Sequence, residues 1–227
     1  MRALSERVKG ARAVDEKKAG LFMVSQPETP NLSRIPGTTK EVRAIKELLE
    51  NHDFRVLCLE SKAATVKEGI LNMETHSCIH FACHASQNTL EPLKSRFILQ
   101  DGNLELATII KKNLVGADLA YLSACQTSTG DEKLSEEAVH LAAGMLAAGY
   151  RGVVATMWSI SDHHGPQVAE DFYASLLTHG AESGRLSALS SDDAAQALHC
   201  ATQKLRKKLG DEASSLLVWI PYVHFGI

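Results

Sequence analysis

Two residues that could do chemistry together, His84 and Cys125, each follow a short run of apolar and small residues. His84 directly follows residues 78–83, and Cys125 directly follows residues 117–124. Both runs are too short for an amphipathic helix and lack its periodicity, so they predict buried parallel strands. Open α/β sheets bind their ligands at the carboxyl ends of such strands. If the two strands are neighbours, the imidazole lies beside the thiol, as a base lies beside the nucleophile that it activates.

The composition limits the classes of protein to which the chain can belong. Its 227 residues fit one large α/β domain, or one domain with a tail, and suffice for a sizeable core. The net charge of -3, with both signs interspersed, gives no electrostatic basis for a nucleic-acid or membrane partner. Glycine-rich phosphate-binding motifs are absent from the sequence, so we predict no nucleotide cofactor.

The cysteines and the apolar segments indicate the compartment. Five cysteines without regular spacing argue against a disulfide framework and favour a reducing compartment. The sequence has no apolar run of about 18 residues, the length that a membrane helix requires. Residues 1–19 are charged and lack the apolar segment of a secretion signal. We therefore expect a cytoplasmic protein.

Strand-like and helix-like segments alternate along the chain, which predicts a mostly parallel sheet of about six strands with helices on both faces. The predicted strands span residues 20–25, 54–59, 76–83, 117–124, 152–158 and 216–225, the last at an edge because it contains Pro221. The predicted helices span residues 38–49, 64–73, 106–112, 135–148, 167–177 and 192–209. Thr38 and Glu41 have the spacing of a capping box, and an Asp-Gly pair predicts a hairpin over residues 97–104.

A cluster of histidine and cysteine residues offers a second kind of chemistry. His76, Cys78, His80, Cys83 and His84 lie close together in the sequence, and such tracts can bind zinc. Side chains two residues apart on a strand stand nearly 7 Å from each other, whereas zinc needs its ligands about 2.0–2.3 Å from one centre. A straight strand does not bring three of them to that centre. We predict no metal site, with an α/β metal- or ligand-binding domain as the alternative.

Three sequence blocks resemble the signature blocks of the CHAT domain, a family of caspase-like cysteine peptidases close to separase. They are His-Phe-Ala-Cys-His at 80–84, Leu-Ser-Ala-Cys-Gln-Thr at 122–127, and Val-Ala-Thr-Met-Trp-Ser-Ile-Ser-Asp at 154–162. The resemblance extends from about residue 24 to residue 222 and implies a caspase-like three-layer sandwich over residues 20–227. Residues 1–19 would then be a tail or the end of a preceding module, because CHAT domains often follow helical repeats in a longer protein. The implied partner is a protein or peptide substrate, without a cofactor.

The resemblance also assigns roles in catalysis. It implies that His84 is the base and Cys125 the nucleophile of a dyad that forms a thioester acyl-enzyme, with the amides of Ala85 and Cys125 binding the oxyanion. Caspase-like enzymes usually have glycine after the catalytic histidine, and alanine resists the positive φ angles that glycine accepts. A distorted oxyanion hole would slow catalysis and leave the dyad intact. A catalytically silent signalling or interaction module is therefore the alternative function.

Asp162 follows the predicted strand 152–158 by four residues. Its sequence position fits two roles equally well, a cap of the helix that follows or a carboxylate in the substrate pocket. In separase-like enzymes the similar Trp-x-x-x-Asp block supplies an acid that pairs with arginine. The resemblance therefore implies cleavage after Arg, less after Lys, and essentially none after Asp.

Overall fold

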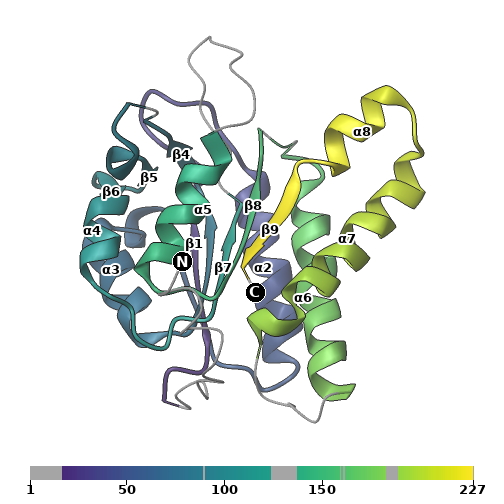
Figure 1. The fold of residues 1–227 in the computed structure, drawn as a ribbon, viewed down its shortest axis with the longest axis horizontal. Helices are drawn as coiled ribbons and strands as arrows, with labels where there is room; N and C mark the ends of the chain where they lie inside the picture. Colours follow the sequence, from purple (N-terminus) through teal and green to yellow (C-terminus); the bar gives the residue numbers. More distant parts are fainter. Residues whose placement is uncertain are drawn as a thin grey trace.

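The computed structural model describes residues 17–88, 90–123, 137–158, 160, 162–182 and 189–226, with only the backbone described for 137–140. Among these residues, a six-stranded sheet forms the centre of the molecule, with the strand order β2-β1-β3-β7-β8-β9 (Figure 1). Its strands are β1 (Leu21–Ser25), β2 (Val56–Glu60), β3 (Cys78–Ala82), β7 (Leu119–Leu122), β8 (Gly152–Thr156) and β9 (Tyr222–Gly226). All neighbouring pairs are parallel except β8 and β9. The predicted mostly parallel sheet is confirmed.

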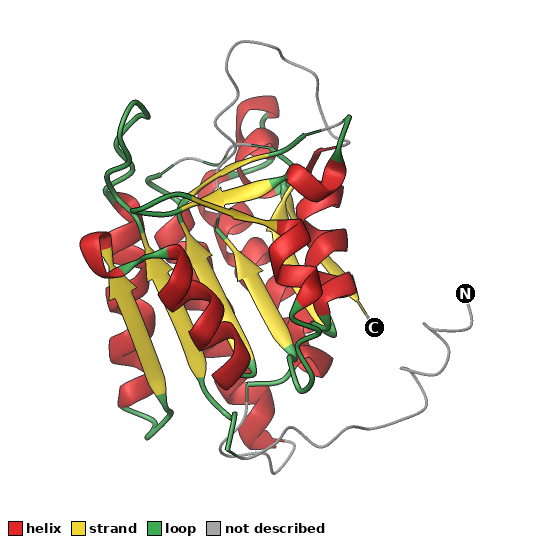
Figure 2. Ribbon diagram, turned by 90° about the vertical axis from the view of Figure 1, so that its left-hand side faces the viewer, coloured by secondary structure: helices red, strands yellow, loops and turns green. Residues whose placement is uncertain are grey.

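Helices cover both faces of this sheet (Figures 1 and 2). The helices α3 (Val66–Thr75), α4 (Leu106–Lys111) and α5 (Glu137–Ala148) pack on one face, and α2 (Gly37–Glu50), α6 (Gly165–Glu182) and α7 (Ala194–Leu209) on the other. Successive strand residues point to opposite faces, so Phe22 and Val24 enter one core while Leu21 and Met23 enter the other. Because both faces are buried, the strands read as continuous apolar runs, as predicted.

A small antiparallel sheet lies across the top of the large one, beyond the end of β3 (Figure 2). It contains β4 (His84–Ser86), β5 (Arg96–Ile98) and β6 (Asn103–Glu105). The pairing of β5 with β6 confirms the hairpin predicted from the Asp-Gly pair. The chain bends at Cys83, so His84 begins a new strand instead of lying in a loop. Short 3-10 turns occupy Ser61–Ala63, Pro92–Lys94 and Ser191–Asp193.

The predicted strand 216–225 is wrong in its first half. Residues Ala213–Trp219 form helix α8, and the strand β9 begins only at Tyr222. A short apolar run does not distinguish a strand from a helix by periodicity alone, and here the run packs as a helical turn beside α7. The edge position is confirmed, because β9 pairs only with β8 in the described sheet.

The predicted capping box at the start of α2 is also wrong. The helix begins at Gly37, so Thr38 lies inside it, and the Thr38 hydroxyl donates to the carbonyl oxygen of Ile35 at 2.9 Å. The N–H of Gly37 donates instead to the carboxylate of Asp162, with its nitrogen 3.0 Å from Oδ1 and 2.9 Å from Oδ2. A distant aspartate therefore caps α2, which leaves Glu41 free to turn toward the sheet.

Two expectations concern the ends and the surroundings of the chain. The predicted N-terminal segment 1–19 lies outside the described residues except for 17–19, so the domain boundary near residue 20 stays a prediction. The helices of the described part are all too short or too polar to cross a membrane.

The close approach of Asp162 to α2 predicts a cost for any side chain at Gly37. A Cβ there would lie 2.3 Å from both the carbonyl oxygen and Oδ1 of Asp162. We expect Gly37→Ala to lower the free energy of unfolding by about 1–3 kcal/mol, measured by urea denaturation.

Gly69→Ala is the matched control, since Gly69 lies in α3 and its Cβ would meet only the ends of two leucine side chains, at 3.3 and 3.6 Å. Alanine is the better helix former, so this variant should be as stable as the wild type or up to about 1 kcal/mol more stable. Equal stability of Gly37→Ala and the wild type would contradict the contact with Asp162.

Candidate active site

The strands that lead to His84 and Cys125 are parallel neighbours. Strand β3 pairs with β7, and the last matched pair is Phe81 with Leu122. In the sequence, His84 follows Phe81 by three residues and Cys125 follows Leu122 by three. The predicted adjacency of the two strands is therefore confirmed. Cys125 lies among residues 124–136, outside the described part, so its contact with His84 stays a prediction.

The side chain of His84 is fixed in one orientation and is almost fully buried, with 1% of its surface exposed. Its Nε2 lies 2.8 Å from the carbonyl oxygen of Ser33. A carbonyl oxygen can only accept, so Nε2 carries a proton in this contact. The other ring nitrogen, Nδ1, has no hydrogen-bond partner among the described residues. A neutral His84 with this tautomer has a free lone pair on Nδ1, as a general base requires.

The group that orients His84 is not an asparagine or aspartate side chain. The backbone carbonyl of Ser33 takes that place. The loop that carries it, between β1 and α2, is held by the amide of Ile35, which donates to the carbonyl oxygen of Pro27 at 3.0 Å. A backbone carbonyl has no side-chain signature, so the sequence alone does not indicate this contact.

The residue after the histidine, Ala85, lies in strand β4 opposite Phe97 and is fully buried. It is not among the described residues with positive φ. Alanine therefore adopts the observed backbone conformation without strain, and the position does not require glycine. The role of the Ala85 amide toward an oxyanion stays a prediction.

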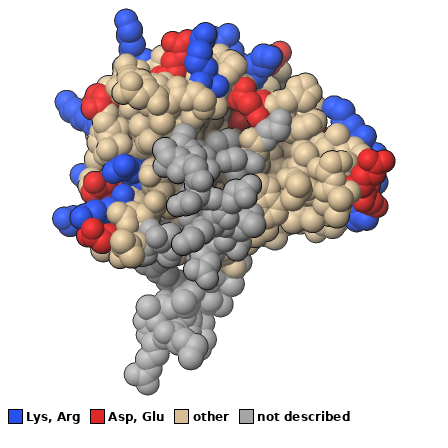
Figure 3. All heavy atoms as spheres, turned by 90° about the horizontal axis from the view of Figure 1, so that it is seen from above, with Lys and Arg blue, Asp and Glu red and all other residues tan. Residues whose placement is uncertain are grey.

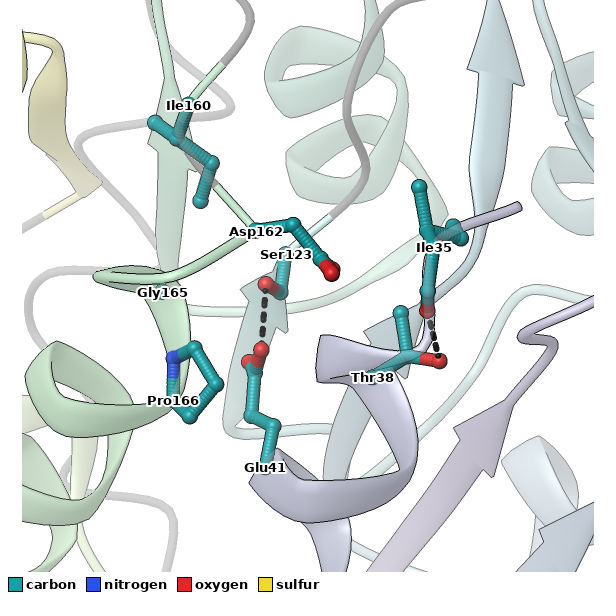
Figure 4. A pocket seen from close by; sticks show the side chains of 8 residues that line it. All are labelled: Ile35, Thr38, Glu41, Ser123, Ile160, Asp162, Gly165 and Pro166. Carbon is teal, nitrogen blue, oxygen red and sulfur yellow. Dashed lines mark hydrogen bonds between the residues drawn. The ribbon is translucent and has the colours of Figure 1, made fainter. Parts of the chain in front are cut away.

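The buried carboxylate of Glu41 contacts residues from both of these strand segments, and Figure 4 shows its contact with Ser123. Its Oε2 accepts a hydrogen bond from the Ser123 hydroxyl at 3.0 Å. Its Oε1 lies 2.9 Å from Nε2 of His80, close enough for an ion pair although the two groups are not aligned as a hydrogen bond. Ser123 follows β7 directly and His80 lies in β3. One carboxylate thus contacts residues of both strands.

Two tyrosines hold His80 from the other sides. The hydroxyl of Tyr173 lies 3.2 Å from Nδ1 of His80, and the ring of Tyr121 stacks on the imidazole with 4.8 Å between ring centroids. Burial raises the pKa of the Tyr173 hydroxyl well above its usual value, so it stays protonated and can donate to Nδ1. A Tyr173 hydroxyl that donates to Nδ1 favours the tautomer with the proton on Nε2, the nitrogen nearer to Glu41.

Glu41 belongs to the predicted capping box, yet its side chain is buried. A signal was present, because Glu41, Ile45 and Leu49 follow each other at intervals of four residues, the spacing of one helix face. All three are buried against the sheet. A glutamate on the apolar stripe of a helix points inward and needs buried partners.

Asp162 caps a helix, but a different one from the helix that its sequence position predicts, and its role in the substrate pocket stays a prediction. It caps α2, not α6, which begins three residues after it. The residue is exposed at the surface, and a carboxylate has more acceptor sites than one N–H fills. It also borders a cavity of about 10 Å³, space for a single water, so a larger group would have to approach its exposed side. The cavity is lined by Ile35, Thr38, Glu41, Ser123, Ile160, Asp162, Gly165 and Pro166 (Figure 4).

The histidines and cysteines near β3 do not converge. His76 contacts the ring of Phe22, which belongs to one core, whereas Cys78 belongs to the core on the opposite face of the sheet. Burial lowers the pKa of His76 and raises that of Cys78 to about 12. In the part of the chain that the structure describes, no group of three histidine, cysteine, aspartate or glutamate residues is arranged to hold a metal ion.

The surface that surrounds the strand ends has no single sign of charge. In the view from above, lysine and arginine side chains alternate with acidic ones around the margin of the described surface (Figure 3). This agrees with the interspersed charges of the sequence.

Comparisons with known proteins support this fold. The chain superposes on the crystal structure of the Arg-specific cysteine proteinase gingipain R with a TM-score of 0.61 and 13% sequence identity, over 94% of this chain and 47% of that one. A complex of the pro- and mature domains of the same proteinase from Porphyromonas gingivalis gives a TM-score of 0.59 and 12% identity, over 94% and 48%. The chain therefore spans about half the length of these structures, and at such identity they show the fold alone. No curated protein matches the sequence.

The family follows from a match over the entire sequence. A model of the CHAT domain matches residues 1–227. The mostly parallel six-stranded sheet with helices on both faces is the caspase-like architecture that this family implies. The chain therefore belongs to the CHAT family of caspase-like cysteine peptidases.

Proposed function

We propose that the protein is a cysteine endopeptidase in which His84 and Cys125 form the catalytic dyad. The observation that carries the proposal is the pairing of β3 with β7, in which both residues follow the last matched pair by the same number of positions. The free lone pair on Nδ1 of His84 and the family membership support it further.

The mechanism is acyl transfer in two steps. Nδ1 of His84 takes the proton of the Cys125 thiol, and the sulfur attacks the scissile carbonyl carbon. The amides of Ala85 and Cys125 stabilise the oxyanion. His84 then gives its proton to the leaving amine as the C–N bond breaks, which leaves a thioester. Water, deprotonated by His84, hydrolyses the thioester and releases the thiol. The carbonyl of Ser33 stabilises the protonated imidazole throughout.

The preferred substrate carries arginine before the scissile bond, with lysine second. Asp162 supports this preference because the residue is exposed and follows β8, the strand next to β7. An arginine guanidinium pairs with a carboxylate through two hydrogen bonds, whereas an ammonium offers a single point charge. The Arg specificity named for gingipain R agrees with the proposal.

The setting of the enzyme is also a proposal. The four cysteines that the structure describes are free thiols, which supports a cytoplasmic, reducing location. Its partners would be protein or peptide substrates, with helical-repeat domains beside it in a longer parent protein.

Cys125→Ala should abolish peptidase activity and leave the fold intact. Without the thiol no thioester forms, so kcat/KM for an arginyl amide should fall by about 10⁴ or more. Cys200→Ala is the control, since Cys200 is a half-exposed thiol on α7, far along the chain from the dyad. Unchanged turnover in the Cys125 variant would end the dyad proposal, and loss of cooperative unfolding would show that Cys125 is a core residue.

Iodoacetamide should label Cys125 before the other cysteines and abolish turnover, whereas chelators should have no effect. Burial raises the thiol pKa of Cys58 and of Cys78 to about 12. At pH 8 only about one in ten thousand of these thiols is the reactive thiolate. Peptide mapping after limited labelling at pH 8 measures the order. If Cys125 reacts no faster than Cys58, the catalytically silent module becomes the better description, and a chelator-sensitive, stoichiometric metal would restore the metal alternative.

Asp162→Asn separates the two roles of this residue. The amide oxygen can still accept from Gly37, so stability should be retained, but the charge that pairs with arginine is lost. We expect kcat/KM for arginyl substrates to fall by about tenfold to a hundredfold, with little change for leucyl substrates. Asp162→Ala should lose the same preference and also about 1 kcal/mol of stability with the cap. An Asn variant with an unchanged Arg/Leu ratio would leave Asp162 as a cap of α2 only.

A further inference from the structure

The contacts of Glu41 join the two strands that deliver the dyad. His80 precedes His84 by four residues on the β3 side, and Ser123 precedes Cys125 by two on the β7 side. Both contact the same carboxylate, His80 at 2.9 Å and Ser123 at 3.0 Å. His80 and Ser123 are 0% and 5% exposed, so water does not compete for these contacts.

The carboxylate has neighbours from several elements besides the two strands. It extends from α2, which packs against the sheet through Val42 and Ile45. The first residue of α6, Gly165, is also a neighbour, since a Cβ there would be in van der Waals contact with Oε2 of Glu41 at 3.5 Å. The amide end of an 18-residue helix carries partial positive charge, which stabilises a nearby carboxylate. A side chain with this many fixed neighbours has little freedom to move.

We propose that Glu41 is a positioning residue that fixes the ends of β3 and β7 relative to each other and thereby sets the distance between His84 and Cys125. This inference rests on the proposed function. Glu41 takes no proton and touches no substrate in this role. It acts because proton transfer between thiol and imidazole needs close contact, and a misplacement of about 1 Å can cost a hundredfold in rate.

Glu41→Gln tests the proposal directly. The amide nearly matches the carboxylate in shape but lacks the charge that His80 meets, so the variant weakens one side of the bridge. We expect kcat for an arginyl amide to fall by about tenfold to a hundredfold, with KM changed by less than about twofold. Glu47→Gln is the matched control, because Glu47 lies on the same helix at an exposed position.

A second measurement separates positioning from a general loss of stability. The rate of Cys125 alkylation by iodoacetamide, followed against pH, reports the thiolate that His84 stabilises. In Glu41→Gln its midpoint should rise toward about 8.5, the value of an isolated thiol. Ser123→Ala, which removes only the hydroxyl on the β7 side, should shift the midpoint in the same direction while the protein unfolds cooperatively.

These measurements distinguish a failure of the positioning role of Glu41 from a failure of the proposed peptidase function. If the folded Glu41→Gln variant keeps the wild-type kcat and alkylation midpoint, the positioning role is wrong. If Glu41→Gln does not fold, an unchanged midpoint in Ser123→Ala overturns it, and a raised midpoint supports it. If the wild type cleaves no peptide, the proposed function fails, while the alkylation midpoints of the variants still decide the positioning role.

Discussion

A carboxylate buried between a sheet and two helices must find partners for both of its oxygens, and Glu41 finds them on two different strands. This requirement fixes how α2, β3 and β7 are placed relative to one another. Helix α2 must pack on the sheet with Glu41 facing inward. His80 of β3 and Ser123, just after β7, must both lie within contact distance of its carboxylate. Burying such a charge without these partners would cost several kcal/mol. The network therefore restricts how far the two strands can shift relative to each other.

The amino end of each of the helices α2 and α6 lies near a carboxylate from the other segment. Asp162, just before α6, accepts from the first amide of α2, and Glu41, in the second turn of α2, lies close to the first residue of α6. Each helix end thus receives the negative charge that its dipole favours from the neighbouring segment. This arrangement brings Asp162 to the border of the same small cavity as Glu41 and Ser123, although Asp162 is far from both in the sequence.

The similarity to gingipain R is one of architecture. At 13% identity it covers the arrangement of strands and helices and does not extend to the side chains of a site. In this chain, the Ser33 carbonyl contacts Nε2 of His84, and the buried carboxylate of Glu41 contacts His80 of β3. In a fold that hosts many activities, such local contacts carry the chemistry.

The sequence by itself determined most strands, most helices and the fold class, because each of these depends on local periodicity and turn chemistry. The three blocks around His84, Cys125 and Asp162 also sufficed to indicate the family. The tertiary structure decided the features that depend on residues distant in the sequence. It replaced the expected Thr38 cap with Asp162, made the last apolar run a helix before β9, and buried Glu41 against His80 and Ser123. These outcomes depend on partners up to 125 positions apart, and a short-range pattern does not register which distant group satisfies a helix end or a buried charge.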